Sequence, residues 1–491
     1  MHYSLNFFHY FWMDEKVSKN FENSSNIPSW LMRKTLSILI CEGGNKMKKK
    51  LLALLLCLTM GLSLMACSGT NEQATEGSGS EEQAVTKLVV WGGVPGESGP
   101  QDLVDAFNAS HTDIQVEYNR FVNDDTGNTK LDTAIMSGEQ IDVFFTYSTD
   151  LLKKRVNGGM VEPLESYGVV DFIKENITTN TDHVSMIDDK YYALPTVKEF
   201  FGFMINEDML LEKGVEISDD WTVDEFVEVA KALTDTTGDQ TIYGVHPYSG
   251  GLPLNFALTV LGGDSYYKND GNESNFDSKE FAANARIQEL MAEGYAMPFE
   301  EVFAQKLEMY AHPAFLNEEV AIMPFSTWML RYVKDLENFP HDFKVTFAAF
   351  PTTEAGVDNN FRAYLNNNIC MNSKSENKEA AWEFMQYWIT EGSEYMLKAG
   401  KIPAWSKADT ALVSEKILGD NADTLFNAES YARVVMNPDN AYIVDTITTA
   451  YPQIVEIYKE ESELFFLGET TKDDYLKNLK SRADDAIKAE Q

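Results

Sequence analysis

Hydrophobic and polar residues between positions 87 and 145 follow a pattern that predicts strands and helices in alternation. Residues 87–91 (KLVVW) form a short apolar run that two glycines end, which is typical of a buried strand. Residues 101–110 place Leu103, Val104 and Phe107 at helical spacing. The same patterns predict further strands at 114–118 and 141–145 and a helix at 130–136. This order predicts a parallel α/β sheet with right-handed crossover connections.

Later segments continue in the same style without repeating the sequence. Residues 221–234 predict an amphipathic helix that opens with a capping box of Thr222 and Glu225. The other predicted helices are 277–293, 376–390 and 471–489, and the other predicted strands are 242–245, 320–324 and 343–348. At about 150 residues per domain, this length fits two α/β lobes.

A secretory signal is predicted near the start of the chain. Met47 and three lysines precede an apolar stretch at 51–61, which is too short for a spanning helix. The sequence Leu-Met-Ala-Cys that ends at Cys67 resembles the end of a bacterial lipoprotein signal, in which the cysteine is lipidated. An ordinary cleaved signal is the alternative. The Gly/Ser/Thr/Glu-rich stretch at 67–86 predicts a flexible tether.

Residues 1–46 precede this signal. Glu42, Gly43 and Gly44 lie just before Met47, as expected where a purine-rich ribosome-binding sequence is read in frame. We therefore expect 1–46 to be an upstream mistranslated leader and 47–66 to be the signal peptide. An amphipathic leader with its own function is the rival interpretation.

Composition narrows the possible partners. The 491 residues include 77 acidic and only 40 Lys and Arg residues, a formal net charge of −37. This argues against nucleic acid as a partner and against electrostatic attraction to anionic lipid. Of the 4 cysteines, Cys67 and Cys370 follow the signal, so no disulfide framework or cysteine zinc site is predicted. Cys370 is expected to be a small buried residue.

Motifs for catalysis are not found. The chain has no Gly-x-Ser-x-Gly elbow, His-Glu-x-x-His helix or P-loop. Its histidines after the signal are scattered, so no metal site is predicted, and no cofactor is expected. The many acidic residues leave a glycosidase-type pair of carboxylates open as an alternative. We predict that the protein is not an enzyme.

Four segments in order resemble the extracellular solute-binding proteins of ABC importers, family 1, in the sugar-binding branch. The first is 130–143, with Ile141 in place of the usual proline, and the second is 188–214, DDKYYALPTVKEFFGFMINEDMLLEKG, followed by WTVDEF from Trp221. The third is 320–328, VAIMPFSTW, and the fourth is 372–404. The resemblance covers residues 87–487, nearly all of the chain after the signal.

The resemblance implies a type II periplasmic-binding-protein-like α/β fold, with two lobes joined by a multi-strand hinge and the ligand cleft between them. The chain would cross between lobes near 196–200, 362–366 and 401–405. The boundaries expected from it are 87–196 plus 325–365 for lobe 1 and 197–324 plus 366–491 for lobe 2. Closure of the cleft around ligand would be the function.

Sugars are held by aromatic faces and by hydrogen-bonding polar side chains, at strand ends that face a cleft. Trp328 matches the family's cleft tryptophan. The full set of candidate contacts is Trp91, Tyr147, Ser148, Asp150, Glu199, Tyr248, Trp328, Tyr364, Asn366 and Trp405. Trp221, Trp382 and Trp388 are expected in the core, and of Tyr191 and Tyr192 one is expected to face the cleft.

The prediction is a monomeric, lipid-anchored protein on the outer face of the cell membrane, in a Gram-positive type of bacterium. It would capture a carbohydrate, an oligosaccharide, and deliver it to an ABC permease. Alternatives keep the fold but bind a polyamine, a metal, phosphate or a peptide, or serve a sensory receptor. A surface enzyme is the remaining rival.

Overall fold

The computed structural model describes residues 85–238 and 240–491. The predicted leader at 1–46, the signal peptide at 47–66, Cys67 and nearly all of the tether lie outside the described residues. Within the two described ranges, no helix combines the length and the apolar character needed to cross a membrane.

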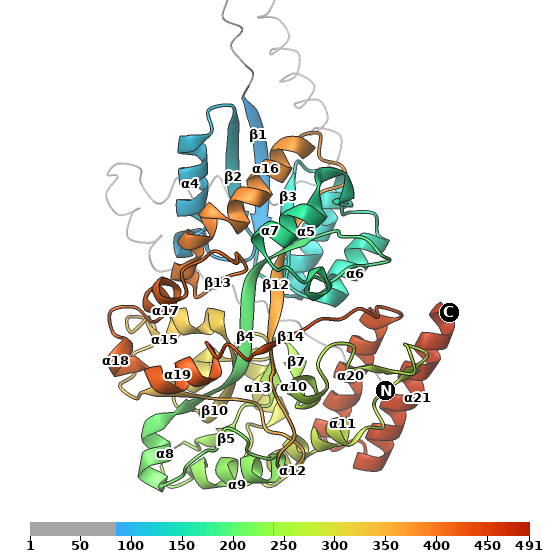
Figure 1. Cartoon of the computed structure of the whole chain (residues 1–491). Coiled ribbons are helices and arrows are strands. Elements are labelled where there is room, and N and C mark those ends of the chain that lie inside the picture. Colours follow the sequence, from blue (N-terminus) through green and yellow to red (C-terminus); the bar gives the residue numbers. More distant parts are fainter. Residues whose placement is uncertain (1–84, 239) are drawn as a thin grey trace, which may run out of the picture. The chain divides into compact units, whose positions relative to one another are not determined.

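The first lobe is built on three parallel strands in the order β2-β1-β3 (Figure 1). Val90 in the middle strand pairs with Tyr118 on one side and with Val143 on the other. Its elements are β1 (Thr86–Gly92), α4 (Pro100–Ser110), β2 (Ile114–Arg120), α5 (Asp125–Ser137), β3 (Val143–Thr146), α6 (Thr149–Asn157) and α7 (Val169–Asn176). The alternating order and the parallel pairing confirm the prediction for residues 87–145.

Two long antiparallel strands, β4 (Leu194–Asn206) and β12 (Phe361–Met371), connect the lobes. The end of β12 pairs with β3 of the first lobe, whereas the end of β4 pairs with strands of the second lobe. The short β13 (Ile402–Pro403) pairs with Lys198 and Val197 in the middle of β4. The three segments expected to cross between the lobes therefore lie side by side in one sheet.

The second lobe forms around the second half of β4. There β4 pairs antiparallel with β10 (Val320–Ser326) and β11 (Val345–Ala348), and β10 pairs parallel with β5 (Tyr243–Val245). The helices between β4 and β12 are α8 (Glu207–Lys213), α9 (Val223–Leu233), α10 (Ala257–Leu261), α11 (Lys279–Ala283), α12 (Arg286–Ala292), α13 (Phe299–Gln305), α14 (His312–Leu316) and α15 (Leu330–Val333). Two small hairpins, β6 (Tyr248–Ser249) with β7 (Leu252–Pro253) and β8 (Tyr267–Lys268) with β9 (Glu273–Ser274), complete it. The predicted capping box of Thr222 and Glu225 opens α9.

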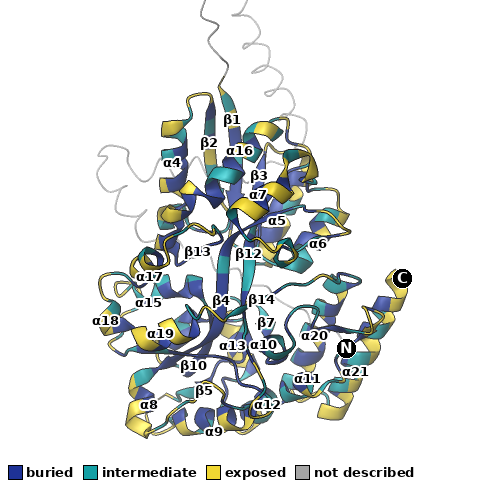
Figure 2. Ribbon diagram, viewed as in Figure 1, coloured by how far each residue is buried: buried dark blue, intermediate teal, exposed yellow. Residues whose placement is uncertain are grey.

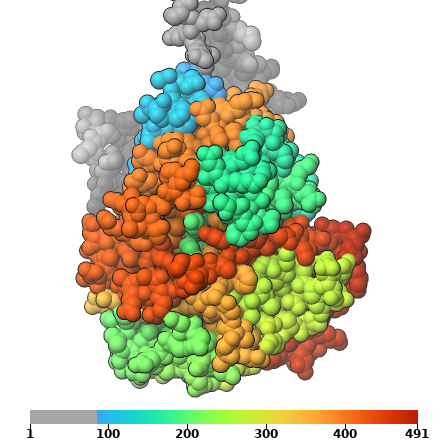
Figure 3. Space-filling model, viewed as in Figure 1, coloured from blue at the N-terminus to red at the C-terminus, as the bar shows by residue number. Residues whose placement is uncertain are grey.

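The part of the chain that follows β12 joins both lobes. After β12 the chain forms α16 (Lys378–Ile389) and the 3-10 helix η5 (Glu391–Ala399) on the first lobe, and then passes through β13. It continues as α17 (Thr410–Leu418), α18 (Ala422–Leu425), α19 (Ala428–Val434), β14 (Ala441–Ile443), α20 (Tyr451–Phe466) and α21 (Lys472–Glu490). Figure 3 shows this stretch as an orange-red band between the teal segments of the first lobe and the green and yellow segments of the second.

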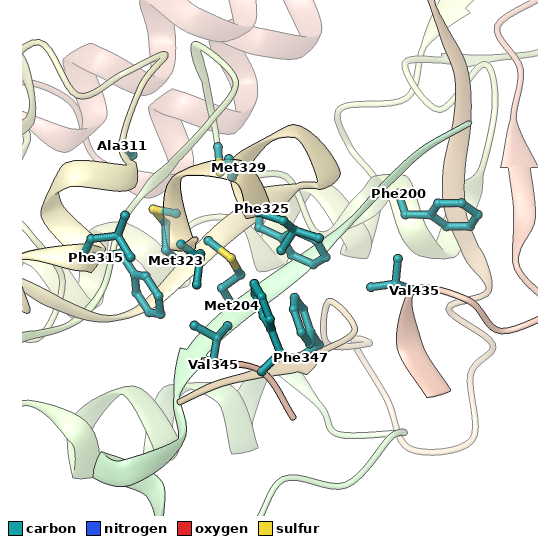
Figure 4. Packing of buried hydrophobic residues seen from close by; sticks show 14 of the residues in the cluster. Phe200, Met204, Ala311, Phe315, Met323, Phe325, Met329, Val345, Phe347 and Val435 are labelled. Carbon is teal, nitrogen blue, oxygen red and sulfur yellow. The ribbon is translucent and has the colours of Figure 1, made fainter. Parts of the chain in front are cut away.

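Buried apolar side chains form separate cores in the two lobes, beneath an exposed outer layer (Figure 2). In the first lobe, α16 packs against β1 and β3 through Phe384 and Trp388. In the second lobe, Met204 of β4 packs among Met323, Phe325 and Phe347 (Figure 4). Cys370 is fully buried, as expected, and burial raises the pKa of its thiol to about 12.

The expected division of the chain between the lobes differs from the observed strand pairing. Residues 325–365 were assigned to the first lobe, but Phe347 of β11 pairs with Met204 in the second. The helix α16 was assigned to the second lobe, but it packs in the first-lobe core. The reason is that β12 runs back toward the first lobe, so the segments before and after it lie on opposite sides of the crossing.

The helix predicted over 277–293 is two helices, α11 and α12. The break lies at Asn284, whose side chain accepts a hydrogen bond from the Phe256 backbone N–H and donates to Asn255, both at 2.9 Å. These bonds reach across the fold, so the spacing of apolar residues within the segment does not reveal them.

Phe325 of β10 is a test of the core shown in Figure 4, because it is fully buried and its ring centroid lies 5.2 Å from that of Phe347 in β11. We expect Phe325→Ala to lower the free energy of unfolding by about 3–5 kcal/mol through lost burial and the cavity left behind. Urea denaturation measures this. Phe303→Ala is the matched control, since Phe303 is 64% exposed, and a similar loss for both variants would contradict the placement of Phe325.

Candidate functional site

The carboxyl ends of β1 and β3 meet at the edge of the first lobe that faces the second. Trp91 near the end of β1 is 7% exposed, and the Lys130 Nζ lies 5.5 Å from its ring centroid. The Gly93 backbone N–H donates to the Tyr147 hydroxyl at 2.6 Å. A Cβ at Gly93 would lie 2.9 Å from the Tyr147 ring, so only glycine allows this approach. Trp91 and Tyr147 thus lie on one edge.

Three candidates come from the start of α6. Burial raises the pKa of the half-buried Tyr147, whose ring lies 6.2 Å from Phe145. Ser148 occupies the N-cap position of α6 without making a side-chain capping bond. Asp150 lies in the first turn and pairs with Lys154 at 3.7 Å. The polar groups of Ser148 and Asp150 are therefore half-buried at the lobe edge.

Aromatic side chains of the second lobe gather around Trp328, which lies in the 3-10 helix η4 (Thr327–Met329). Its ring centroid is 5.8 Å from that of Tyr310 and 6.0 Å from that of Tyr332. The Arg331 guanidinium lies over both Trp328 and Tyr332, at 5.5 and 4.6 Å. We call Tyr310, Trp328, Arg331 and Tyr332 the aromatic wall.

This wall touches the first lobe. The Tyr310 hydroxyl donates to the backbone oxygen of Asn123, in the loop after β2, at 3.0 Å. The charge of Arg331 also lowers the pKa of Tyr147 on the opposite lobe, although burial outweighs this effect. The aromatic wall and the strand ends of the first lobe therefore face each other.

The crossing strands form the floor between the two lobes. Asn366 and Tyr364 of β12 pair with Val197 and Glu199 of β4. The Asn366 side-chain amide donates to the Tyr147 backbone oxygen at 3.4 Å, which links the floor to the first lobe. Tyr364 packs 5.3 Å from the ring of Phe201, and its pKa is raised by burial and by Asp445.

Glu199 is also in the floor, but its carboxylate is occupied by protein groups. It is 6% exposed and accepts hydrogen bonds from Thr327, Asn367 and Lys401 at 3.0, 3.3 and 3.4 Å. The contact with Lys401 is a buried ion pair. Glu199 therefore holds the floor together, which its charge alone did not indicate.

A second cluster, opposite the aromatic wall, was not predicted from the sequence. Asp445 accepts from the Tyr451 hydroxyl at 3.0 Å and from the Asp264 backbone N–H at 3.1 Å. Burial raises the pKa of Asp445. Burial, Asp445 and the charge of Asp150 all raise the pKa of Tyr266. We call Tyr266, Asp445 and Tyr451 the acidic wall. Tyr266 and Asp445 lie outside helices and strands, and Tyr451 begins α20, so no sequence signal pointed to them.

The lobes also touch beside the acidic wall. Lys153 of α6 is buried, and its Nζ lies 3.1 Å from both the Asp188 carboxylate and the Thr448 hydroxyl. A cavity of about 10 Å³ remains between the first lobe and the floor, where Tyr118, Tyr147, Asn367 and Lys401 contribute to its lining. Phe145, Trp388 and Met396 of the first lobe line its other side.

Tyr248 is not brought into this cluster, and Trp405 lies at the edge of the floor. Tyr248 is 1% exposed and packs 6.1 Å from the rings of both Phe299 and Phe466, in the second-lobe core. Trp405 follows β13, and its Nε1 is buried without a hydrogen-bond partner in the described part of the chain.

Expected core aromatics behave as predicted in two of three cases. Trp221 and Trp388 are each 2% exposed, whereas Trp382 is half-buried against the first-lobe core. Tyr191 packs in that core and Tyr192 is half-buried beside another cluster. Over residues 85–238 and 240–491, no group of three or more His, Cys, Asp and Glu residues is placed to hold a metal.

His312, stacked 3.7 Å from Tyr332, offers a test of the aromatic wall. Burial and the charge of Arg331 lower its pKa from 6.5 to about 3. The unfolded chain therefore binds a proton more readily, and this group destabilises the fold as the pH falls from about 6.5 toward 3. Between pH 7 and pH 5, the wild-type protein should lose about 2 kcal/mol more stability than His312→Phe, because that variant keeps the stacking without a titratable group.

Urea denaturation at both pH values measures this difference. Carboxyl groups titrate equally in both proteins, so their contribution cancels. Parallel stability curves for the two proteins would contradict a buried neutral His312.

Known structures share this architecture. The chain superposes with a TM-score of 0.66 on an ABC substrate-binding protein from Listeria monocytogenes in complex with cycloalternan, at 19% identity over 82% of this chain and 99% of that one. For a cyclic alpha-maltosyl-1,6-maltose binding protein from Arthrobacter globiformis the TM-score is 0.61, at 18% identity over 83% and 100%. These similarities show the predicted type II fold of two α/β lobes.

Sequence comparisons give the family. A galactooligosaccharide-binding protein of Bacillus subtilis (strain 168) is 27% identical over 195 residues, which are 39% of this chain and 42% of that protein. The chain thus spans less than half the length of this curated relative. The family model for bacterial extracellular solute-binding proteins matches residues 93–395. The chain therefore belongs to the family of bacterial extracellular solute-binding proteins.

Proposed function

We propose that the protein is the substrate-binding component of an ABC importer, and that it captures a carbohydrate, an oligosaccharide, between its two lobes. The observation that carries this is the meeting of an aromatic wall, a polar floor and the strand ends of the first lobe at one place. Ring faces pack on the C–H patches of sugars, while amide, hydroxyl and carboxylate groups bond the sugar hydroxyls. The alternation of both kinds of group suits an oligosaccharide.

The similar proteins support this choice of ligand. The three similar proteins described above are a galactooligosaccharide-binding protein, a protein in complex with cycloalternan and a cyclic alpha-maltosyl-1,6-maltose binding protein. The sugars in these names are all oligosaccharides.

The proposed contacts come from every side of the cleft. The first lobe supplies Trp91, Tyr147, Ser148 and Asp150, the floor supplies Tyr364 and Asn366, and the second lobe supplies Trp328 together with Tyr310 and Arg331. Trp405 stays a candidate at the edge of the floor. Tyr248 is omitted because its ring is enclosed in the core.

Capture and release need only a change in lobe spacing. The Tyr310–Asn123 and Lys153–Thr448 contacts join the lobes and would break on opening. A ligand favours the closed state to the extent that it gains contacts there. The protein acts as a monomer that presents its closed form to a membrane permease, and it breaks no bond in its ligand.

A polyamine is the second candidate. The acidic wall favours it, since Asp445, Asp150 and Asp264 lie near three tyrosines. Carboxylates with aromatic faces are suited to organic cations. Arg331 and Lys401 lie elsewhere in the same cleft and oppose a cationic ligand there.

A thermal-shift screen of the purified protein against oligosaccharides, monosaccharides, polyamines and metal salts tests the proposal. A ligand present at about 100 times its dissociation constant should stabilise the fold by about 2.7 kcal/mol. We expect a raised melting temperature with one oligosaccharide series. A raised melting temperature with spermidine alone would make a polyamine the ligand in place of a carbohydrate. An unchanged melting temperature with every sugar would contradict carbohydrate binding.

Trp328 should carry much of the affinity. We expect Trp328→Ala to weaken binding of that oligosaccharide by at least about 2 kcal/mol, roughly 30-fold, as for other buried aromatic contacts. Isothermal titration calorimetry measures the dissociation constant. Trp382→Ala is the matched control, because Trp382 packs against Tyr167 and Phe172 on the outer side of the first lobe. Equal effects of both substitutions would contradict a contact at Trp328.

We also propose that Cys67 carries a lipid that anchors the protein to the outer face of the membrane of a Gram-positive type of cell. A diacylglyceryl group with two chains is sufficient for stable anchoring. Cells fed radiolabelled palmitate should label the wild-type protein but not Cys67→Ser, whereas Cys370→Ser should label normally. Labelling of Cys67→Ser would contradict the proposed site.

A further inference from the structure

Four polar side chains from four separate segments meet in the floor of the cleft. They are Glu199 of β4, Thr327 of η4, Asn367 of β12 and Lys401 beside β13, and none is more than 6% exposed. Glu199 is the centre, because it accepts a hydrogen bond from each of the other three. We call these residues the floor cluster.

The floor cluster contains a buried ion pair, so removing the charge of one partner should disturb it. The Lys401 Nζ lies 3.4 Å from the Glu199 carboxylate, and no other hydrogen-bond acceptor for it occurs within residues 85–238 and 240–491. Burial lowers the pKa of Lys401, while Glu199 raises it. Breaking such a pair on one side leaves an uncompensated buried charge, which is far more harmful than removing both charges.

The floor cluster is joined directly to the aromatic wall. Thr327, which donates to Glu199 at 3.0 Å, immediately precedes Trp328 in η4. Gly400, next to Lys401, packs so closely that a Cβ there would lie 2.6 Å from the Thr327 backbone oxygen. The position of Trp328 thus depends on groups that Glu199 holds from both sides.

The floor cluster also lies at an irregularity in β12. The backbone angle φ of Asn367 is 52°, a left-handed conformation that is uncommon for a residue other than glycine. The pairing with β4 passes from Asn366–Val197 to Asn368–Pro195 around it. Its side chain donates to Glu199 and its backbone oxygen accepts from the Thr196 hydroxyl at 2.8 Å. Both bonds hold this conformation at the crossing between the lobes.

We propose that Glu199 is a positioning residue for ligand capture: it fixes Trp328, through Thr327, in the orientation that binds carbohydrate, and it does not touch the ligand. This inference rests on the proposed function. The Glu199 carboxylate already accepts hydrogen bonds from three protein groups, so it has little capacity left to accept one from a sugar hydroxyl. The result is a cleft whose aromatic wall is set before ligand arrives.

The test uses protein labelled with 5-fluorotryptophan, in which loss of a signal in Trp328→Phe assigns the Trp328 resonance. We expect Glu199→Gln and Lys401→Met each to shift this resonance in the ligand-free protein and to weaken oligosaccharide binding at least tenfold. In the double variant, the Trp328 resonance and the affinity should both return toward their wild-type values. The amide oxygen introduced by Glu199→Gln still accepts from Thr327, and no buried charge is left unpaired.

Glu461→Gln is the matched control. Glu461 is 3% exposed and pairs at 2.7 Å with the partly exposed Arg482, between α20 and α21, so this substitution removes a buried carboxylate outside the floor. It should lower the melting temperature without moving the Trp328 resonance or the affinity. Thr327→Val is the second variant if Glu199→Gln fails to fold, and it should shift the same resonance.

Weaker binding by Glu199→Gln with an unmoved Trp328 resonance would overturn the proposal, because Glu199 would then contact the ligand itself. An unchanged affinity would overturn it as well. Failure of the wild-type protein to bind any oligosaccharide would instead overturn the proposed function, while the ligand-free resonance would still decide whether Glu199 positions Trp328.

Discussion

The unbroken strand β4 is the constraint on which the rest of the structure depends. A buried strand must satisfy its backbone N–H and C=O groups on both sides, and β4 does so with different partners along its length. Its first half pairs with β12 and β13, and its second half pairs with β10 and β11. Because these pairings share one strand, both lobes are attached to β4. Residues from four distant segments therefore meet beside it.

That convergence explains how a very acidic chain builds a cleft of mixed charge. Lys401 is buried at the crossing and paired with Glu199, and Arg331 lies over the rings of the aromatic wall. At the other end of the floor, burial keeps the pKa of Asp445 raised, beside Tyr451 and Tyr266. Basic and acidic side chains are therefore held in separate groups of residues, each next to aromatic rings.

The fold was predictable where the information is local. The alternation of β1, α4, β2, α5 and β3 follows from the spacing of apolar residues, and the capping box of α9 from two side chains three residues apart. The break at Asn284 was not predictable, because it depends on bonds to Asn255 and Phe256. The lobe to which each later segment belongs depends on the direction of β12, which no local pattern records.

The candidate site, too, was predictable only where the information is local. Trp91 ends a predicted strand, Tyr147 and Trp328 follow two others, and the structure places each at the edge between the lobes. Tyr248 follows a predicted strand too, yet Phe466, from a distant part of the chain, encloses its ring. Glu199 lies at a predicted crossing, but its role changes with Lys401 and Asn367, which reach it only through strand pairing. Position after a strand thus indicates which residues can reach the cleft, whereas the partners supplied by distant segments decide which of them stay free to meet a ligand.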